Sequence, residues 1–384
     1  MTFLLDAQGT VGSWQDHLSY STSHYLAGGG DNIYSSAGAS LLVHDISSGT
    51  LSSLSRVSGL NEALIGAVAW CEEEETLIIV YRNTGVDLVK KGVITNIPDI
   101  KNKYIPGLKE IYSVSVSGDR ALLSGSFGIV VINVSGRYVA DTWRPGPDGD
   151  NNEVYETAII NNQIYAATAR GVYSAPLNKT GLSYFDNWEI LGELPSPDSK
   201  YDRIAAARSV LFISKPGTPS VSDSLFRVIP GENAALLYTA PGGSMRSIDA
   251  ANNSICVAMP SSIKMFSTEG SEIREITGYG WASANPVQTI FYRENLWIAD
   301  ASVGLVSTAD FNKFTNYTIP GPYTNNVADI HLAGDRCFIT GGTVDNAWGN
   351  VYRPFQVFVN SGKTWNSHIP VSYTHLTLPT NREV

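Results

Sequence analysis

The chain has 384 residues, of which 43% are hydrophobic and 16% are charged, and its formal net charge is −10. This composition supplies a large apolar core and excludes wholesale disorder. The chain has no cluster of lysines and arginines, so it lacks the basic face that a nucleic-acid-binding protein needs. Three cysteines do not make a disulfide framework, and no apolar stretch approaches the ~20 residues of a transmembrane helix.

The first residues resemble the end of a secretory signal. Phe3, Leu4 and Leu5 are apolar and are followed by Ala7 and Gln8, which resembles a small-residue cleavage site, although the charged and long apolar regions of a full signal are missing. We therefore expect residues 1–12 to be the remnant of a signal peptide or leader and the protein to be exported.

From residue 23 onward the chain repeats a unit of short strands and tight turns. In the first unit we expect strands at residues 23–27, 32–36, 40–45 and 50–54, and in the next two units at 76–81, 86–89, 121–124 and 129–134. One strand position recurs at a spacing of roughly 41–46 residues, which is the period of four-stranded propeller blades. The copies of that position are Ile33, Leu77, Ala121, Ile164, Val210, Ile255, Leu296 and Cys337.

The clearest copy of the unit spans residues 159–177. Asn161 and Asn162 suit the positive φ values of a two-residue hairpin turn. Because side chains alternate across a strand, we expect Ile164, Ala166 and Thr168 on one face and Tyr165, Ala167 and Ala169 on the other. Eight such units predict an all-β propeller of four-stranded antiparallel blades, and the repeat alone leaves seven or eight blades open.

The most polar loop of the chain, residues 143–153, is the candidate ligand or partner loop. Trp143 and Arg144 could stack on a sugar and pair with an anionic group, and Asp148, Asp150 and Glu153 offer oxygen ligands that suit Ca²⁺. The spacing misses the calcium-loop signature, because Glu153 stands where glycine is required. An ordinary polar turn and packing at a blade edge are the competing interpretations, so we assign no metal site here.

No catalytic signature is present. The chain lacks nucleophile-elbow, zinc-protease, P-loop and dinucleotide motifs. Residues 360–365 partly match the Asp-box turn of sialidase-like propellers, with Phe358 in place of the serine and Asn360 in place of the aspartate. A sialidase also needs an arginine cluster and an acid pair that converge on the ring centre, which a sequence does not show. We therefore predict no enzyme activity, no catalytic residues and no cofactor.

Motifs at the two ends of the chain resemble one family. They are G-S-W-Q-D-H-L-S-Y at residues 12–20 and, in the eighth unit, W-G-N at 348–350 and P-F-Q-V-F-V-N-S-G-K-T-W-N at 354–366. Together with the repeated units, they resemble the PorZ family of type IX secretion system surface components of Bacteroidota and related two-component-regulator propellers. This resemblance implies two seven-bladed propellers and a small C-terminal β-domain. It also implies a sortase partner and binding of anionic lipopolysaccharide.

With the family as a guide, we expect a seven-bladed propeller over residues 13–325. Residues 326–370 would be an eighth blade-like unit that closes the ring or opens a truncated second propeller. Residues 371–384 resemble a translated sequencing adapter, a contaminant at contig ends, and we expect them to be non-native.

These expectations combine into a non-enzymatic binding scaffold of the type IX secretion system at the outer-membrane surface or in the periplasm. The resemblance implies the sortase as its protein partner and anionic lipopolysaccharide or glycan as a further ligand, and we expect no nucleic acid. A glycan-sensing propeller of a hybrid two-component regulator is the first alternative. A glycan-cleaving propeller enzyme is the second.

Overall fold

The computed structural model describes residues 14–147, 152–251, 253–334, 336–341, 349, 356–362 and 364–368. The chain divides into two compact units. The first comprises Met1–Trp14 and Ser21–Thr318, and the second comprises Gln15–Tyr20 and Ile319–Val384. The expected leader at residues 1–12 and the expected non-native tail at 371–384 lie outside the described residues.

The first unit is built from four-stranded antiparallel sheets, each made of strands that are consecutive in the chain. The first three blades contain β1 (Leu26–Gly29), β2 (Asn32–Ser36), β3 (Leu41–Asp45) and β4 (Leu51–Leu54); β5 (Ile65–Cys71), β6 (Thr76–Tyr81), β7 (Val86–Lys90) and β8 (Val93–Ile97); and β9 (Ile111–Ser117), β10 (Arg120–Gly125), β11 (Gly128–Asn133) and β12 (Tyr138–Trp143). The next two contain β13 (Val154–Ile160), β14 (Gln163–Thr168), β15 (Gly171–Pro176) and β16 (Glu189–Ile190); and β17 (Arg203–Ala207), β18 (Val210–Lys215), β19 (Asp223–Val228) and β20 (Ala235–Ala240). The last two contain β21 (Ser247–Ala251), β22 (Ser254–Met259), β23 (Ser262–Ser267) and β24 (Glu272–Ile276); and β25 (Pro286–Tyr292), β26 (Asn295–Asp300), β27 (Gly304–Thr308) and β28 (Thr315–Tyr317).

Helical structure is sparse. The short helix α1 (Asp99–Asn102) follows the second blade, and the 3-10 turn η2 (Phe185–Asn187) lies within the fourth. Within the described residues, no helix combines the length and the apolar character that crossing a membrane requires.

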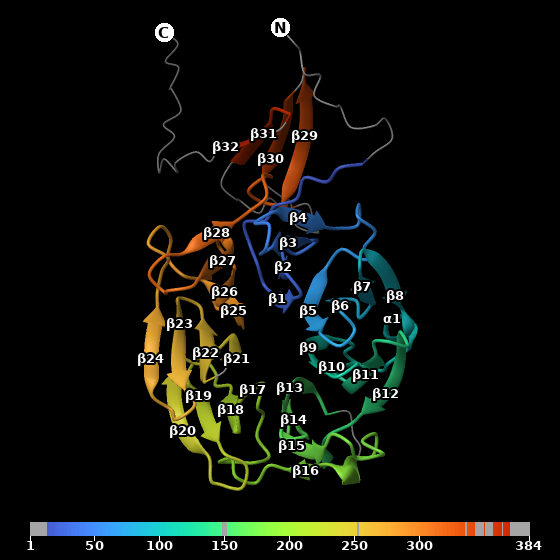
Figure 1. Cartoon of the computed structure of the whole chain (residues 1–384), viewed down its shortest axis with the longest axis vertical. Coiled ribbons are helices and arrows are strands. Elements are labelled where there is room, and N and C mark those ends of the chain that lie inside the picture. The colour runs from blue at the N-terminus through green and yellow to red at the C-terminus, as the bar shows by residue number, and fades with distance from the viewer. Residues whose placement is uncertain are drawn as a thin grey trace, which may run out of the picture. The chain divides into compact units, whose positions relative to one another are not determined.

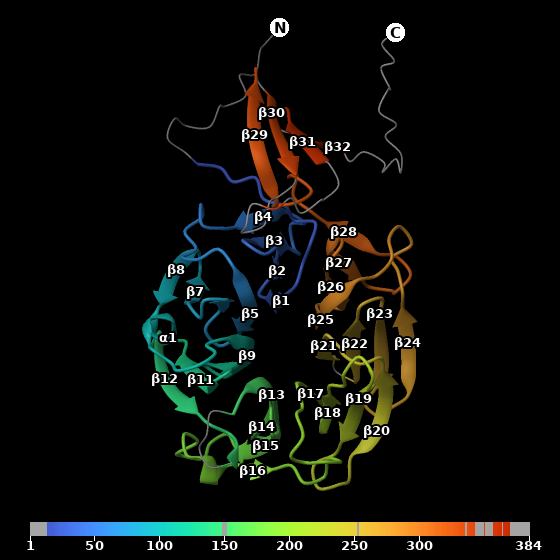
Figure 2. The ribbon, with the colours of Figure 1, turned by 180° about the vertical axis from the view of Figure 1, so that it is seen from behind.

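The blades form a closed ring, and the first strand of each sheet lies nearest the centre of that ring, as Figures 1 and 2 show. Each first strand contacts the first strand of the next blade, from β1 through β25, and β25 contacts β1. At that closing contact, the Leu26 N–H donates to Gln288 Oε1 at 2.9 Å, and the Tyr292 hydroxyl donates to the Gly30 carbonyl at 2.6 Å. The prediction of a seven-bladed ring of four-stranded blades is confirmed, and the ring closes without the eighth unit.

The core consists of apolar layers between neighbouring blades, because each strand presents side chains to both faces of its sheet. In β14, Ile164 and Ala166 pack in the layer shared with the third blade, while Tyr165 and Ala167 pack in the layer shared with the fifth. This is the alternation that the sequence predicts. Asn161 and Asn162, with φ values of 49° and 61°, form the turn before β14 as expected.

All eight repeat positions fall in the second strand of their sheet, so the repeat is in register throughout. The expected strand at residues 23–27 is wrong at its start, because β1 begins at Leu26. Ser23 bonds instead to the last blade, with its N–H donating to the Asp300 carbonyl at 2.8 Å, and its hydroxyl lies 2.7 Å from the Ser35 hydroxyl.

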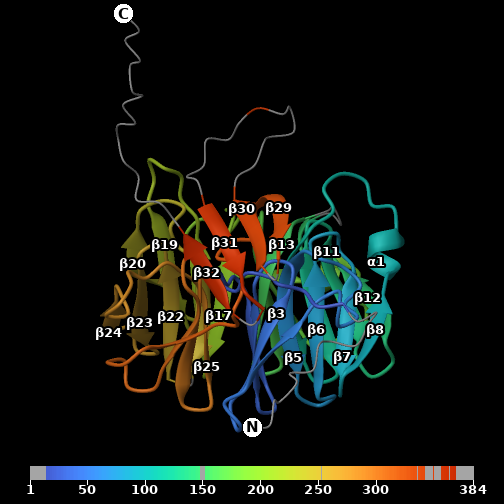
Figure 3. The ribbon, with the colours of Figure 1, turned by 90° about the horizontal axis from the view of Figure 1, so that it is seen from above.

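The second unit contains the eighth four-stranded sheet, β29 (Val327–Ala333), β30 (Arg336–Gly341), β31 (Gln356–Asn360) and β32 (Trp365–His368) (Figure 3). The segment 15–20 packs in the same unit. The Ser19 N–H donates to Asn325 Oδ1 at 2.7 Å, and the ring of His17 lies 5.4 Å from that of Trp365. The two terminal motifs therefore meet in one unit, and its role as the start of a second propeller stays a prediction.

Candidate functional site

Trp143, the first residue of the candidate loop, ends β12 and is only 3% exposed. Its indole packs against that of Trp188, with ring centroids 6.4 Å apart, and its Nε1–H donates to Asp141 Oδ2 at 2.9 Å. The structure therefore gives Trp143 a packing role between the third and fourth blades.

The remaining residues of the loop do not form one cluster in the described structure. Arg144 is exposed and lines a pocket on the third blade, whereas Glu153 accepts hydrogen bonds from the hydroxyls of Tyr112 at 3.4 Å and Tyr155 at 2.5 Å. Burial and the Glu153 carboxylate raise the pKa of both tyrosines, that of Tyr112 to about 12. Asp148 and Asp150 lie outside the described residues, so a ligand role for this loop stays a prediction.

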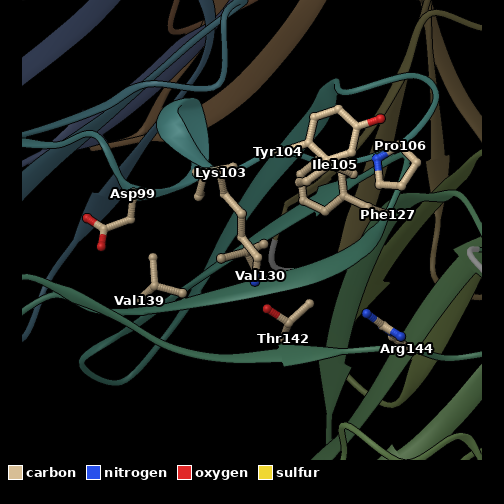
Figure 4. A pocket seen from close by; sticks show the side chains of 11 residues that line it. Asp99, Lys103, Tyr104, Ile105, Pro106, Phe127, Val130, Val139, Thr142 and Arg144 are labelled. Atoms are coloured by element: carbon tan, nitrogen blue, oxygen red, sulfur yellow. The ribbon is translucent and has the colours of Figure 1, made fainter.

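The pocket beside Arg144 is a cavity of about 530 Å³ on the ring. The connection from the second to the third blade forms one wall, and strands β11 and β12 form the other (Figure 4). Its apolar lining comes from both walls and consists of Ile100, Ile105, Pro106, Phe127, Val130 and Val139. We call it the blade-3 pocket. Helix α1, which begins this connection, lies beside β8 and β12 at the edge of the ring (Figures 1 and 3).

The connecting loop is fixed at its base, so the pocket is preformed. The Lys109 ammonium donates to the carbonyls of Lys101 at 2.6 Å and Lys103 at 2.9 Å. The Ser126 hydroxyl donates to the Leu108 carbonyl at 2.7 Å, and Lys101 also pairs with the Glu62 carboxylate. These contacts hold the loop above the sheet. The side chains of the loop leave the space beneath it unfilled, and that space is the pocket.

The edge of the pocket combines apolar and charged groups. Tyr104 lines the pocket and is 86% exposed, and Leu108, four residues later in the same loop, is also exposed. Figure 4 places Asp99 at one end of the pocket and Arg144 at the other, with Lys103 near the middle. An apolar floor with a cationic edge suits an apolar side chain of a partner that is followed by an acidic group. No group of three or more His, Cys, Asp or Glu residues able to hold a metal ion occurs in the described chain.

Sequence reasoning identified Arg144 but missed the opposite wall. The sequence feature that could have identified this wall is the stretch K-N-K-Y-I-P-G-L-K at residues 101–109. It places exposed apolar residues among lysines in a connection between two blades. Loops of this kind carry binding residues on rigid scaffolds.

Residues 33–189 match the family model described as the TSS9 PorZ N-terminal beta-propeller domain. The ring is PorZ-like. PorZ of Porphyromonas gingivalis, described as an essential bacterial surface component of the type-IX secretion system, has a solved structure that is 16% identical and superposes with a TM-score of 0.75. That match covers 93% of this chain and 46% of the PorZ chain. The chain therefore spans about half the length of PorZ.

Two further solved propellers superpose with lower TM-scores. Sqt1 of Saccharomyces cerevisiae is 10% identical with a TM-score of 0.53, over 90% of this chain and 94% of its own. The Cps50 (Swd1) propeller of Myceliophteria thermophila is 11% identical with a TM-score of 0.52, over 76% and 97%. At these identities the structural matches establish the fold alone, and the match to the PorZ family model is confined to residues 33–189. No curated protein sequence matches this chain. Every residue that lines the blade-3 pocket lies inside the span matched by the PorZ model.

Proposed function

We propose that this chain is a non-enzymatic accessory protein of a type IX secretion system, acting at the outer-membrane surface or in the periplasm. The observation that carries the proposal is the match of residues 33–189 to the PorZ propeller model. A closed ring of packed blades is a rigid body, so its loops and edge pockets present fixed surfaces to other molecules.

The partner in this proposal is the sortase of the same secretion system, and its docking site is the blade-3 pocket. An apolar or aromatic side chain of the partner would occupy the floor beneath Tyr104 and Ile105. Lys103 and Arg144 would then contact an acidic neighbour on the partner. This arrangement fits the usual anatomy of interfaces, in which an apolar anchor is surrounded by polar groups.

Anionic lipopolysaccharide is the second ligand that the PorZ resemblance suggests. The net charge of −10 opposes general capture of an anionic polymer, so such binding would depend on the local cations Lys103 and Arg144. We favour the protein partner at the blade-3 pocket, because most of the side chains that line it are apolar.

The test is deletion of this gene in its host, followed by complementation with the wild-type chain or with a Tyr104→Ala, Leu108→Ala double variant. We expect deletion to abolish surface attachment of secreted cargo and the double variant to restore little of it. Both side chains are exposed, so the variant is expected to fold normally. Full cargo attachment in the deletion strain would contradict the proposed role in secretion.

Pull-down of the purified sortase tests whether the blade-3 pocket is the surface that binds it. The control is Tyr184→Ala, since Tyr184 is 70% exposed on the fourth blade, away from the pocket. We expect the double variant to lose sortase binding and the control to keep it. If the double variant loses binding to purified lipopolysaccharide but binds the sortase normally, the pocket is a lipid site and the docking assignment is wrong.

A further inference from the structure

The first strands of the blades surround the axis of the ring (Figures 1 and 2). A cavity of about 230 Å³ lies there, distinct from the blade-3 pocket. Its charged and aromatic lining residues are His24, Tyr25, Tyr112, Tyr155, Glu156, Arg203, Arg246 and Asp249. We call it the axial cavity.

Two arginines line the axial cavity, and within the described residues their hydrogen-bond acceptors are all neutral. Arg203 Nε–H donates to the Arg246 carbonyl at 2.9 Å, and its Nη1 donates to the Asp202 carbonyl at 2.8 Å. Arg246 Nη1 donates to Asn285 Oδ1 at 2.7 Å and to the Pro286 carbonyl at 2.9 Å. A guanidinium has five N–H groups, so each arginine keeps unused donors. No described carboxylate lies within ion-pairing distance of either guanidinium.

The carboxylates of the cavity are held by other groups. Asp249 Oδ2 accepts from the Ser247 hydroxyl at 2.6 Å and from the Thr289 N–H at 3.1 Å, and Glu156 Oε2 accepts from the Ile204 N–H at 2.9 Å. Burial raises the pKa of Glu156 to about 8, with Arg203 partly opposing the shift, and burial also raises the pKa of Asp249. Burial therefore favours the neutral form of Glu156, so this carboxyl offsets the charge of the two arginines only in part.

Aromatic rings supply an apolar surface beside these donors. Tyr112 and Tyr155 line the cavity with ring centroids 5.2 Å apart, and their hydroxyls bond to Glu153. Such rings contact the carbon skeleton of an organic ligand, which a bare inorganic anion lacks. The volume of about 230 Å³ leaves room for a small organic ligand beside these groups.

We propose that the axial cavity binds a small organic carboxylate of the size of one sugar acid. Arg203 and Arg246 hold its carboxylate through their unused N–H groups, and Tyr112 and Tyr155 contact its carbon skeleton. The cavity thus combines arginines and acids at the ring centre, the convergence that the sequence could not show. The proposal concerns binding alone, and it does not depend on the role in secretion.

The test is isothermal titration calorimetry of the full chain with D-glucuronate, D-glucose and inorganic phosphate. We expect saturable binding of glucuronate and none of glucose, which has the same ring without the carboxylate. Phosphate bound as tightly as glucuronate would overturn the assignment to a carboxylate. Absence of glucuronate binding to the wild-type chain would overturn the site itself, whatever the variants do.

Substitutions assign the site. We expect Arg203→Lys and Arg246→Lys each to weaken glucuronate binding about tenfold or more, because lysine keeps the charge but loses the planar fork. The control is Arg227→Lys, since Arg227 Nε–H also bonds to the next blade, donating to the Thr268 carbonyl at 2.6 Å, but does not line the cavity. Equal weakening in the control would show that the losses come from loosened blades, and it would overturn the assignment.

Discussion

The imidazole of His44 on the first blade lies 4.4 Å from the phenol ring of Tyr317 on the last blade, measured between ring centroids. Its centroid also lies 5.5 Å from that of Trp297. All other neighbouring blades are joined directly by the chain, whereas this pair is held only by non-covalent contacts, because none of the described strands is exchanged between sheets. The aromatic contact is therefore part of what keeps the ring closed.

The first prediction concerns pH. His44 is only 6% exposed, and this burial lowers its pKa. A hydrogen bond with the Thr50 backbone and the negative charge of Asp45 act in the opposite direction and offset part of the shift. The unfolded chain, with a histidine pKa near 6.5, therefore takes up the proton first. We expect the contribution of His44 to stability to be complete above about pH 6.5 and to be lost as the pH falls below that value. Urea denaturation at a series of pH values measures it.

The informative quantity is the difference between the wild-type chain and His44→Phe. Burial, Arg82 and Arg246 lower the pKa of His24, so His24 also makes the chain less stable as the pH falls. The raised pKa of Glu156 changes the stability with pH in the opposite direction. Both effects remain in the variant and cancel in the difference. A difference that does not change with pH would show that His44 does not titrate as its surroundings require.

The repeat could be predicted from the sequence because short stretches of neighbouring residues determine it. Turn residues such as Asn161 and Asn162 and the alternation around Ile164 recur at a fixed period, so the strands and their faces follow from the chain itself. The two cavities were not predictable in this way. Arg203 and Arg246 meet only because the ring places successive first strands side by side, and the blade-3 pocket depends on how the loop from residue 99 to 109 folds back over β11 and β12.

The second prediction concerns Asp300, which is fully buried at the end of β26. Oδ2 accepts from the Tyr279 hydroxyl and the Asn285 N–H, both at 2.7 Å, and Oδ1 accepts from the N–H groups of Ser302 at 2.7 Å and Val303 at 3.1 Å. In Asp300→Asn, either orientation of the amide points its NH₂ at two donors. We expect a loss of about 2–4 kcal/mol in the free energy of unfolding, measured by chemical denaturation.

Asp310→Asn is the matched control for this change. Only one oxygen of Asp310 is used there, accepting from the N–H groups of Asn312 and Lys313 at 2.9 Å each, so the amide can turn its oxygen toward them. We expect little change in stability. A similar loss in both variants would mean that the buried network around Asp300 is not the cause.

The third prediction concerns the close approach of the first two blades at Gly29. A Cβ added there would lie 2.0 Å from Cδ2 of the Trp70 indole on β5, so the indole or the neighbouring backbone must shift to accommodate it. We expect Gly29→Ala to destabilise the ring by about 1–3 kcal/mol through overpacking, with a lower melting temperature in calorimetry. In Gly192→Ala, the added methyl group meets no atom within 4 Å, and we expect almost no shift. Unchanged melting of Gly29→Ala would contradict this account of the contact.

The fourth prediction concerns the charges at the blade-3 pocket. If Lys103 and Arg144 attract an acidic segment of the sortase, the double variant Lys103→Glu, Arg144→Glu should slow association about tenfold or more. The same variant should abolish the decrease of the association rate with salt that we expect for the wild-type chain. Surface plasmon resonance at low and high ionic strength measures both quantities.

The control for this prediction is the double variant Arg56→Glu, Lys313→Glu, which changes the net charge equally at exposed positions on other blades. It should keep most of the wild-type association rate and its salt dependence. If both double variants slow association alike, the net charge of the chain governs the encounter, and the pocket has no special part in it.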